Sequence, residues 1–496
     1  MVLRRLLLLI ALAALTGSGV AQADTTSTLK RVGAQRCTSR FVLYCVPITV
    51  PLDHFAATKG STVPVYFAVH PAERNAHGTL VVATGGPGIS GIGQADKILE
   101  RLPVAVRARY DIVFHDQRGV GLSSDLQCPI ATTAWASASA WSAFGARTMS
   151  RLCPLETKAG DLLPKVSTAQ SVEDLESFRV ALGRPRLTLY GMSYGTTFSQ
   201  VYAARHPSAV AGMILDGTMD PALSGDAATM SQARAFEDVL DSTLSVCDQR
   251  PACRAEMSMS AEDAYDALAA RLEQGPIMTR VPTEQGIVVK RALTIELLHT
   301  LAMHMMYGAA DRAYFLKLLA YAVHGDFARP LLAAYATTGI SVARQQVTSS
   351  AAYLAYECHD QAHWANWPTA AVDAAAAEAT VRPRIAPSIM LAYLPCIGWP
   401  SSAEAGYGAD FGPLPAIPTI VLTATADPAT PYDQALSVAR RLGNVHLVAT
   451  QGGDHVTYRR STACVDRVVD AFLVDGTFQP GRTTCPGEYV GRYPAG

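Results

Sequence analysis

The sequence has 496 residues, of which 49% are hydrophobic, and its formal net charge at pH 7 is −1. This length suits a large α/β domain that carries insertions, and the hydrophobic fraction is ample for a buried core. The near-neutral charge gives no reason to expect a nucleic acid or an anionic membrane surface as a partner.

The N-terminal end, residues 1–23, has the pattern of a secretory signal peptide. Arginines at positions 4–5 precede an apolar run over 6–15, and residues 21–23 form a small-x-small cleavage pattern. Ten apolar residues are too few to cross a bilayer, which takes about 20. No other stretch has the length of a membrane span. We therefore expect an exported chain that begins at Asp24 and is secreted or periplasmic.

All ten cysteines lie beyond this signal, and their number is even. In an exported protein this favours disulfides. Joining neighbours in sequence gives one simple pairing, although the sequence leaves other connectivities open. The pairs are Cys37–Cys45, Cys128–Cys153, Cys247–Cys253, Cys358–Cys396 and Cys464–Cys485. A zinc site is not indicated, because the chain has no C-x-x-C pair.

The first strands of the core are predicted at residues 41–50 and 62–70, as a hairpin near a sheet edge because each contains a proline. A short apolar run over 80–83 is typical of a buried parallel strand. It ends in the loop Thr84-Gly85-Gly86-Pro87-Gly88. The backbone N–H groups of this glycine-rich loop can face a ligand.

The next strand is predicted over 111–115 and leads into Asp-Gln-Arg-Gly-Val-Gly-Leu-Ser at 116–123. We expect Arg118 to tie neighbouring loops together by charge-assisted hydrogen bonds. Residues 125–165 are predicted to be irregular. A helix is predicted over 171–183, with the serine at its start as the N-cap.

The motif Gly191-Met192-Ser193-Tyr194-Gly195 stands between a predicted strand, 187–190, and a predicted helix. In this context G-x-S-x-G marks a nucleophile elbow, in which the chain reverses sharply around the serine. The flanking glycines leave room for the strand and helix to approach each other. The hydroxyl of Ser193 then projects at a helix N-terminus, where a developing oxyanion is stabilised.

The character of the chain changes after the next strand, at 210–215. From Pro221 to Gly412 the sequence is rich in Ala, Met and Leu at helical spacing. We predict a helical cap over 221–412, inserted between a first part of the core (24–220) and a second part (413–496).

The second part of the core contains a predicted strand over 418–424, a last strand over 445–449 and a closing helix near 462–473. Strands that alternate with helices favour a mostly parallel sheet flanked by helices. The predicted fold is therefore of the α/β class, with a large helical cap.

A serine nucleophile needs a base, and the base needs an orienting acid. Asp427 and His455 each follow a late strand, so both reach the sheet edge where Ser193 lies. The order Ser, Asp, His agrees with this fold. Asp216 is a rival acid because it also ends a strand, and His446 is a rival base that fits better as a structural strand residue.

The oxyanion hole in such enzymes uses the N–H group after the nucleophile and one from the loop after an early strand. In this chain those groups are the backbone amides of Tyr194 and Gly86.

Five ordered motifs together resemble one group of α/β-hydrolases, which contains the prolyl iminopeptidases and the secreted tripeptidyl aminopeptidases. They are Gly85-Gly86-Pro87-Gly88, Asp116 to Ser123, Gly191 to Gly195, Asp427-Pro428-Ala429-Thr430-Pro431 and Gly453-Asp454-His455. The match spans nearly all of the mature chain. It implies the α/β-hydrolase fold and the release of residues or short peptides, such as tripeptides, from free N-termini.

The chain departs from that family pattern at Thr84, where the family usually has a histidine. This departure points toward the exported tripeptidyl aminopeptidase branch, and so does Cys464 near the histidine motif.

An aminopeptidase must recognise an ammonium group, and the resemblance implies an acidic residue of the cap in that role. Glu357 is our candidate and Asp360 is the second choice. The alternative is that Glu357 is a solvated surface charge.

Two groups of side chains could suggest a metal, and we expect neither to bind one. Glu357, His359 and His363 lack the H-E-x-x-H order of a zinc peptidase. His299 and His304 lie among methionines that fit a helical core better. No cofactor is expected.

Three functions remain open from the sequence. The first is an exported serine aminopeptidase that acts on peptides with a free N-terminus through an acyl-enzyme. The second is an exported carboxylesterase or lipase with the same triad. The third is an inactive hydrolase fold used for binding, which the complete set of catalytic motifs disfavours.

Overall fold

The computed structural model describes residues 25–58, 60–73, 76–137, 143–157, 159–338, 341–343, 351–361, 369–396, 398–400 and 406–494. The predicted signal peptide and its cleavage site lie outside the described residues.

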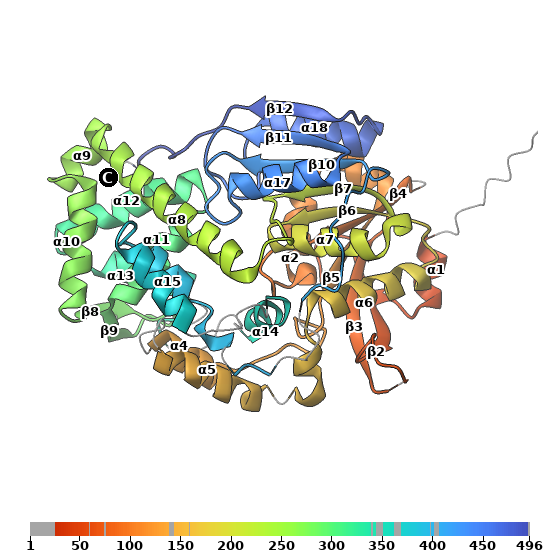
Figure 1. Cartoon of the computed structure of the whole chain (residues 1–496), viewed down its shortest axis with the longest axis horizontal. Helices are drawn as coiled ribbons and strands as arrows, with labels where there is room; N and C mark the ends of the chain where they lie inside the picture. The colour runs from red at the N-terminus through yellow and green to blue at the C-terminus, as the bar shows by residue number, and fades with distance from the viewer. Residues whose placement is uncertain are drawn as a thin grey trace, which may run out of the picture.

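Ten strands form one sheet within these described residues (Figure 1). They are β1 (Gln35–Arg36), β2 (Tyr44–Pro51), β3 (Thr62–His70), β4 (Gly78–Ala83), β5 (Tyr110–Asp116), β6 (Leu187–Met192), β7 (Val210–Asp216), β10 (Thr419–Ala424), β11 (Val445–Thr450) and β12 (Gly481–Cys485). The spatial order is β1-β2-β3-β5-β4-β6-β7-β10-β11-β12. The sheet is parallel from β5 to β12 and antiparallel among β1, β2, β3 and β5.

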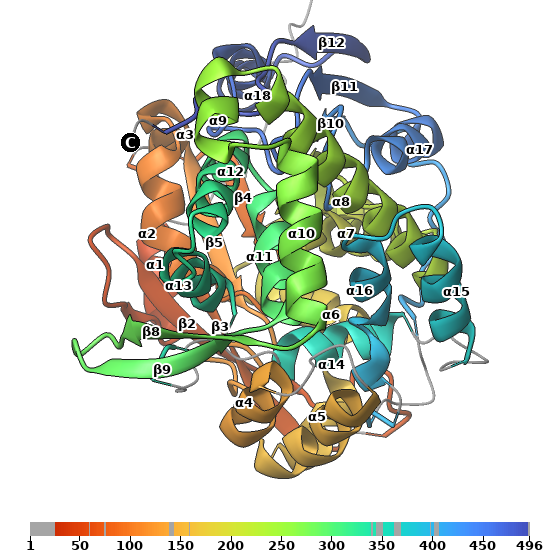
Figure 2. The same cartoon turned by 90° about the vertical axis from the view of Figure 1, so that its left-hand side faces the viewer.

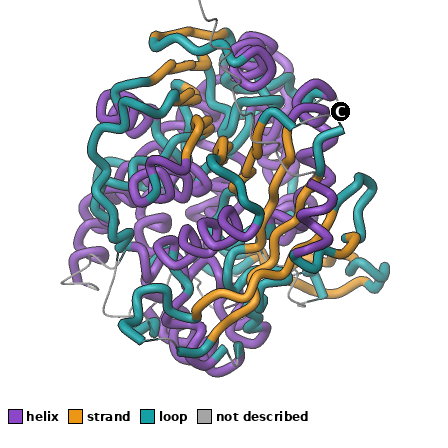
Figure 3. The backbone as a smooth tube through the Cα atoms, turned by 90° about the vertical axis from the view of Figure 1, so that its right-hand side faces the viewer, coloured by secondary structure: helices purple, strands orange, loops and turns teal. Residues whose placement is uncertain are grey.

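Helices cover both faces of the sheet, which explains why β6 and β10 are buried along their whole length and read as continuous apolar runs. One face carries α1 (Thr25–Arg31), α6 (Thr168–Ala181), α7 (Tyr194–Arg205) and α17 (Tyr432–Leu442). The other carries α2 (Gly91–Arg101), α3 (Val104–Arg109) and α18 (Ala463–Asp475). Figure 3 shows the strands passing between these layers. The predicted α/β architecture is confirmed.

Between β7 and β10 the chain is mainly helical. Its helices are α8 (Gly225–Asp248), α9 (Pro251–Met257), α10 (Ala261–Glu273), α11 (Ile295–Met305), α12 (Ala309–Val323), α13 (Ala328–Thr337), α14 (Ala351–Asp360), α15 (Thr369–Ala379) and α16 (Ala386–Leu391). We call residues 225–396 the helical block. Most of it has an apolar core of its own, separate from the two cores that lie against the sheet. Figure 2 views the molecule from the side on which α8, α10 and α12 lie.

Helix α14 is an exception within the block. Its apolar residues, such as Ala355 and Tyr356, belong to the core on the sheet face that also holds α6 and α7. One helix of the inserted segment is therefore built into the sheet-bearing part of the molecule.

The block also contains an antiparallel hairpin, β8 (Ile277–Pro282) and β9 (Val288–Leu293), which the sequence analysis did not predict. Its strands are largely exposed, so their alternation of polar and apolar residues is weak.

Three predictions about the core elements are wrong. Residues 125–165 are not irregular, because they form α4 (Pro129–Ser137), α5 (Ala143–Glu156) and a short 3₁₀ helix (Gly160–Lys165). A proline inside α5 hides its helical pattern. Glu156 accepts hydrogen bonds from the backbone of Ile130 and Ala131, and so holds the start of α4.

The second error is the start of α6. The N-cap is Ser167, whose hydroxyl accepts a hydrogen bond from the Gln170 amide, one turn before the predicted start. Ser171 lies inside the helix, where its hydroxyl bonds the phenol of Tyr356 instead.

The third error concerns the last strand. β12 follows β11 and pairs with it at the sheet edge. Its sequence, Gly-Arg-Thr-Thr-Cys, is polar and mostly exposed, so it carries no apolar signal.

All ten cysteines form disulfides, in the five pairs that proximity in sequence predicts. Such a chain is typical of an oxidising compartment, either the extracellular space or the periplasm. Over the part of the chain that the structure describes, no helix combines the length and the apolar character that crossing a bilayer requires.

Candidate active site

Ser193 lies between β6 and α7, with φ 55° and ψ −123°. This left-handed conformation turns the chain sharply from the strand into the helix. A β-carbon on Gly195 would come within 2.0 Å of the carbonyl oxygen of Ala83, and one on Gly191 within 2.3 Å of the carbonyl oxygen of Gly195. The elbow therefore requires both glycines, as the sequence analysis expected.

Asp427 and His455 lie together at the ends of β10 and β11. Each carboxylate oxygen of Asp427 is 3.0 Å from Nδ1 of His455, and Asp427 is 2% exposed. The same carboxylate accepts hydrogen bonds from the amides of Ala429 and Thr430 and from the Thr430 hydroxyl. This arrangement fixes the carboxylate so that Nδ1 of the imidazole donates to it, which leaves Nε2 as the basic nitrogen.

Nε2 of His455 is buried and has no hydrogen-bond partner within the described ranges. The lone pair of this nitrogen is therefore not engaged by another described group. Catalytic hydrogen bonds are often long in unliganded enzymes and tighten when substrate binds.

Asp216, the rival acid, does not contact the imidazole. Its carboxylate accepts hydrogen bonds from the backbone of Thr457 and Tyr458, just after His455. Its carbonyl oxygen accepts a hydrogen bond from the Ser193 amide, at 2.8 Å. Asp216 thus ties the serine elbow to the histidine loop and is a structural link between them.

The rival base, His446, lies within β11. Its imidazole bonds the carbonyl oxygen of Gln479 and the hydroxyl of Thr483. It connects β11 with the edge strand β12 and lies at the start of β11, at the opposite end from the loop that carries His455.

The loop after β4 lies directly over the elbow. A β-carbon on Gly85 would be 3.0 Å from Cβ of Ser193 and 3.5 Å from its hydroxyl oxygen. Gly86 follows with φ 111°, a conformation that glycine adopts without strain. The amide of Tyr194 is at the first turn of α7, where N–H groups have no partner within the helix. Of the two predicted oxyanion-hole residues, Tyr194 directly follows Ser193, and Gly86 directly follows the glycine that lies against Ser193.

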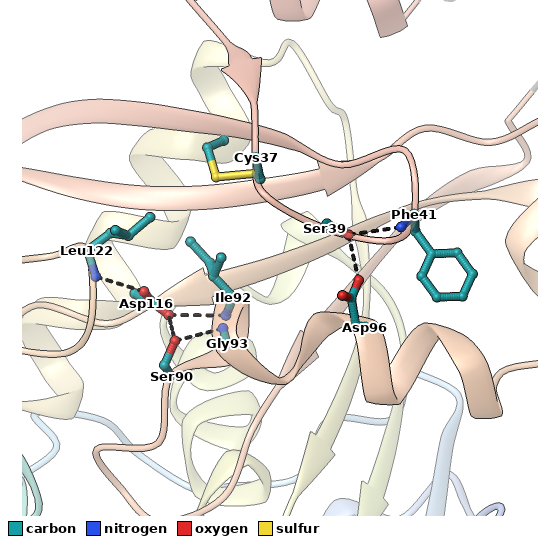
Figure 4. The surroundings of a disulfide bond; sticks show 10 residues. Cys37, Ser39, Phe41, Ser90, Ile92, Gly93, Asp96, Asp116 and Leu122 are labelled. Carbon is teal, nitrogen blue, oxygen red and sulfur yellow. Dashed lines mark hydrogen bonds between the residues drawn. A yellow bond between two sulfur atoms is a disulfide. The ribbon is translucent and has the colours of Figure 1, made fainter. Parts of the chain in front are cut away.

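Asp116, at the end of β5, fixes the far end of this loop (Figure 4). Its carboxylate accepts hydrogen bonds from the Ser90 hydroxyl at 2.6 Å, from the Ile92 amide at 3.1 Å and from the Leu122 amide at 2.9 Å. Ser90 in turn caps α2. Arg118 anchors the neighbouring loop by an ion pair with buried Asp174, as predicted.

Helix α14 begins against this loop and carries two buried acids further along. Its residues Ala352 and Tyr353 pack against Gly88, where an added β-carbon would lie 2.9 Å from the Tyr353 amide. Glu357 and Asp360, further along the same helix, are 6% and 3% exposed. Burial excludes the alternative that Glu357 is a solvated surface charge.

The two acids have different surroundings. Asp360 accepts hydrogen bonds from the amide and hydroxyl of Thr168, and that hydroxyl also bonds the phenol of Tyr194. Glu357 accepts one hydrogen bond from a described residue, the side-chain amide of Gln361 at 2.7 Å. Neither acid forms an ion pair with a described residue. Glu357 is therefore the acid with more capacity to accept a cation.

Burial raises the pKa of Glu357 to about 8 and that of Asp360 to about 7, and in Glu357 the nearby Asp360 adds to the effect. Both carboxylates are costly to ionise without a cation beside them.

The other titratable candidates have structural partners. His299 bonds the Ser388 hydroxyl, and His304 bonds the carbonyl oxygen of Thr300 in its own helix. His359 is buried on α14, and His363 lies outside the described residues. The described ranges contain no cluster of three or more His, Cys, Asp or Glu side chains suited to a metal ion.

Residues 78–458 match the family model described as the alpha/beta hydrolase fold. The chain belongs to the α/β-hydrolase family. The match begins at β4 and ends just past the histidine loop, so it includes every motif that surrounds Ser193.

Three relatives align with 89% of this α/β-hydrolase. Serine protease Hip1 of Mycobacterium tuberculosis is 28% identical and is covered over 87% of its length. Tripeptidyl aminopeptidase of Streptomyces lividans is 25% identical, with 83% covered. Carboxylesterase B of Mycobacterium tuberculosis is 28% identical, with 86% covered. The chain is accordingly a serine hydrolase of this family.

Sequence reasoning did not single out Thr430 and considered Asp216 only as a rival acid. Thr430 holds the carboxylate of Asp427 through its amide and its hydroxyl, and Asp216 links the serine elbow to the histidine loop. Thr430 was visible in the Asp-Pro-Ala-Thr-Pro motif, because a hydroxyl three residues after an aspartate is placed to bond it.

Proposed function

We propose that the protein is an exported serine aminopeptidase whose catalytic residues are Ser193, His455 and Asp427. Export follows cleavage of the signal peptide near Ala23, and the five disulfides support this location.

In the proposed reaction Nε2 of His455 accepts the proton of the Ser193 hydroxyl as its oxygen attacks the peptide carbonyl carbon. The amides of Gly86 and Tyr194 donate hydrogen bonds to the resulting oxyanion. His455 then protonates the leaving amine, which gives an acyl-enzyme, and water releases the acyl group by the same steps in reverse order. Asp427 holds the imidazole in the required tautomer and stabilises its protonated form.

The observation that carries the aminopeptidase proposal is the buried carboxylate of Glu357. It lies on α14, the helix that packs against the loop after β4, and it forms no ion pair with a described residue. The ammonium group of a peptide N-terminus supplies the missing charge. The relatives named serine protease and tripeptidyl aminopeptidase support the same assignment.

A second candidate is a carboxylesterase, because the relative named carboxylesterase B is as similar in sequence as the serine protease. An esterase has no use for an ammonium receptor, so the buried acids favour the peptidase.

The test is a panel of fluorogenic aminoacyl, dipeptidyl and tripeptidyl amides, each with a free and an acetylated N-terminus, together with a simple acyl ester. We expect free N-termini to be preferred by about 10- to 150-fold in kcat/KM, the worth of a hydrogen bond to a charged group. Equal turnover of free and acetylated amides, or turnover of the ester alone, would contradict the proposal. The panel also gives the number of residues released.

A further inference from the structure

The loop that carries His455 is held from two sides. On the sheet side, the carboxylate of Asp216 accepts hydrogen bonds from the backbone amides of Thr457 and Tyr458. On the other side, the loop contacts the segment that follows α11 and includes the first turn of α12, which belongs to the helical block. We call this segment, residues 306–312, the clamp turn.

Three consecutive residues of the histidine loop bond the clamp turn. The carbonyl oxygen of Gly453 accepts a hydrogen bond from Arg312. The carboxylate of Asp454 accepts one from the Ala309 amide at 2.7 Å. The amide of His455 itself donates to the carbonyl oxygen of Tyr307 at 2.9 Å. The ring of Tyr307 also lies edge-on to the imidazole, with 5.3 Å between ring centroids.

Arg312 is the central part of this contact. Its side chain is fully buried, and its guanidinium donates to the carbonyl oxygens of Met306, Gly453 and Tyr489. These oxygens belong to the clamp turn, the histidine loop and the segment after β12. No described carboxylate lies within ion-pair distance of it.

A buried cation without an ionic partner is expensive, and a packed apolar residue of similar size often serves stability equally well. The planar guanidinium differs from such a residue in one respect, because its fixed fork of donors sets the relative positions of several carbonyl groups at once. One of the carbonyl groups that Arg312 binds belongs to Gly453, two residues before His455.

We infer that Arg312 is a positioning residue, which sets the imidazole of His455 relative to Ser193 by fixing the histidine loop against the helical block. The inference rests on the proposed role of His455 as the catalytic base. Arg312 belongs to the helical block, and two of the three segments that it joins lie outside the block. The inference therefore gives the block a part in positioning the proposed base.

The test compares the rate at which an aryl phosphonate labels Ser193, because this reaction needs the activated serine and no peptide recognition. We expect Arg312→Met to lower both this rate and kcat by about 100-fold, the effect of a displacement of roughly 1 Å in a catalytic group. KM should stay nearly constant. Arg312→Lys keeps the charge but not the fork, so it should recover only part of the rate.

Gly453→Ala provides an independent route to the same displacement. An added β-carbon there would lie 2.4 Å from Nη1 of Arg312, so the methyl group pushes the guanidinium away while the charge remains. We expect a similar loss of labelling. If Arg312→Met does not fold, this variant and Arg312→Lys test the role of Arg312 in its place. The matched control is Arg329→Met in α13, whose side chain is 53% exposed, and its rate should equal that of the wild type.

The outcomes separate the two proposals. If the wild type is not labelled at Ser193, the proposed function fails. If the wild type is labelled and folded Arg312→Met or Gly453→Ala is labelled equally fast, the inference about Arg312 is overturned and the proposed function stands. A loss confined to KM, or one that thermal unfolding of the variant fully accounts for, also overturns the inference.

Discussion

At the scale of single residues, the hydroxyl of Ser193 is the group on which the proposed chemistry depends. Ser193→Ala keeps the β-carbon and the backbone, so the strained elbow and the melting temperature should change little. We expect kcat to fall by up to about 10⁶-fold, since members of a triad act as a unit. Peptide hydrolysis and mass spectrometry of the phosphonate-treated protein measure this. Labelling at another residue, or near-normal turnover by the variant, would contradict the assignment.

The contacts of the two buried aspartates predict different kinetic effects. Asp427→Asn offers an amide to Nδ1 of His455 and selects the wrong tautomer, so kcat should fall on the order of 10⁴-fold. Asp216→Asn weakens the hydrogen bonds to Thr457 and Tyr458, so it should lower the melting temperature and reduce kcat far less. Steady-state kinetics and thermal unfolding of both variants provide the measurement. A reversed order of the two kcat values would show that Asp216 orients the imidazole.

Glu357→Gln is expected to act on the substrate's amine and not on the bond-breaking step. It should lower kcat/KM for free-amine peptides by about 10- to 150-fold, the worth of a hydrogen bond to a charged group, and leave an uncharged ester almost unaffected. Asp360→Asn, at the second candidate, is compared in the same way, and the hydrogen bonds of Asp360 to Thr168 predict a smaller selective loss. An equal loss on both substrate types would mean that Glu357 has a structural role.

At the scale of elements, α14 should make the protein sensitive to pH. Burial raises the pKa of Glu357 from 4.5 to about 8, so the folded chain keeps a proton that the unfolded chain releases. The stability from this protonated acid is therefore complete below about pH 4.5 and is lost as the pH rises through about 8. Glu357→Gln should accordingly raise the melting temperature more at pH 8.5 than at pH 5. A difference that is constant with pH would show that the acid is not shifted.

The elements that the sequence predicts are those with a strong local signal. The buried strands beside Ser193 and the elbow itself are recognised because apolar runs end in glycine motifs, and the geometry of Asp427 and His455 agrees with their motifs. β12 and the β8–β9 hairpin carry no such signal, because exposed edge strands need no apolar run. The sequence also does not predict the contacts of the clamp turn, because no pattern around Arg312 indicates a contact with a loop 141 residues away.

At the scale of the whole molecule, the disulfides should contribute unequally to stability. The chain-entropy model gives about 4 kcal/mol for Cys358–Cys396, with a separation of 38 residues, and about 2 kcal/mol for Cys247–Cys253, with a separation of 6. Replacing both cysteines of a pair by alanine should therefore lower the free energy of unfolding more for the first pair. Denaturant titration measures the difference. Mass spectrometry of the alkylated native protein should find no free thiol.

The path of the chain after β12 has a consequence for how the protein comes to be active. This segment returns to the helical block, where Tyr489 accepts a hydrogen bond from Arg312, Val490 enters the apolar core and Gly491 bonds Ala309. These residues follow Ser193, Asp427 and His455 in the chain. A chain in which Ser193, Asp427 and His455 are already in place still lacks one of the carbonyl groups that bind Arg312 of the clamp turn until this segment docks. Hydrolytic activity should thus appear only after residues 489–491 have docked on the helical block, which makes this docking a late step in the gain of activity.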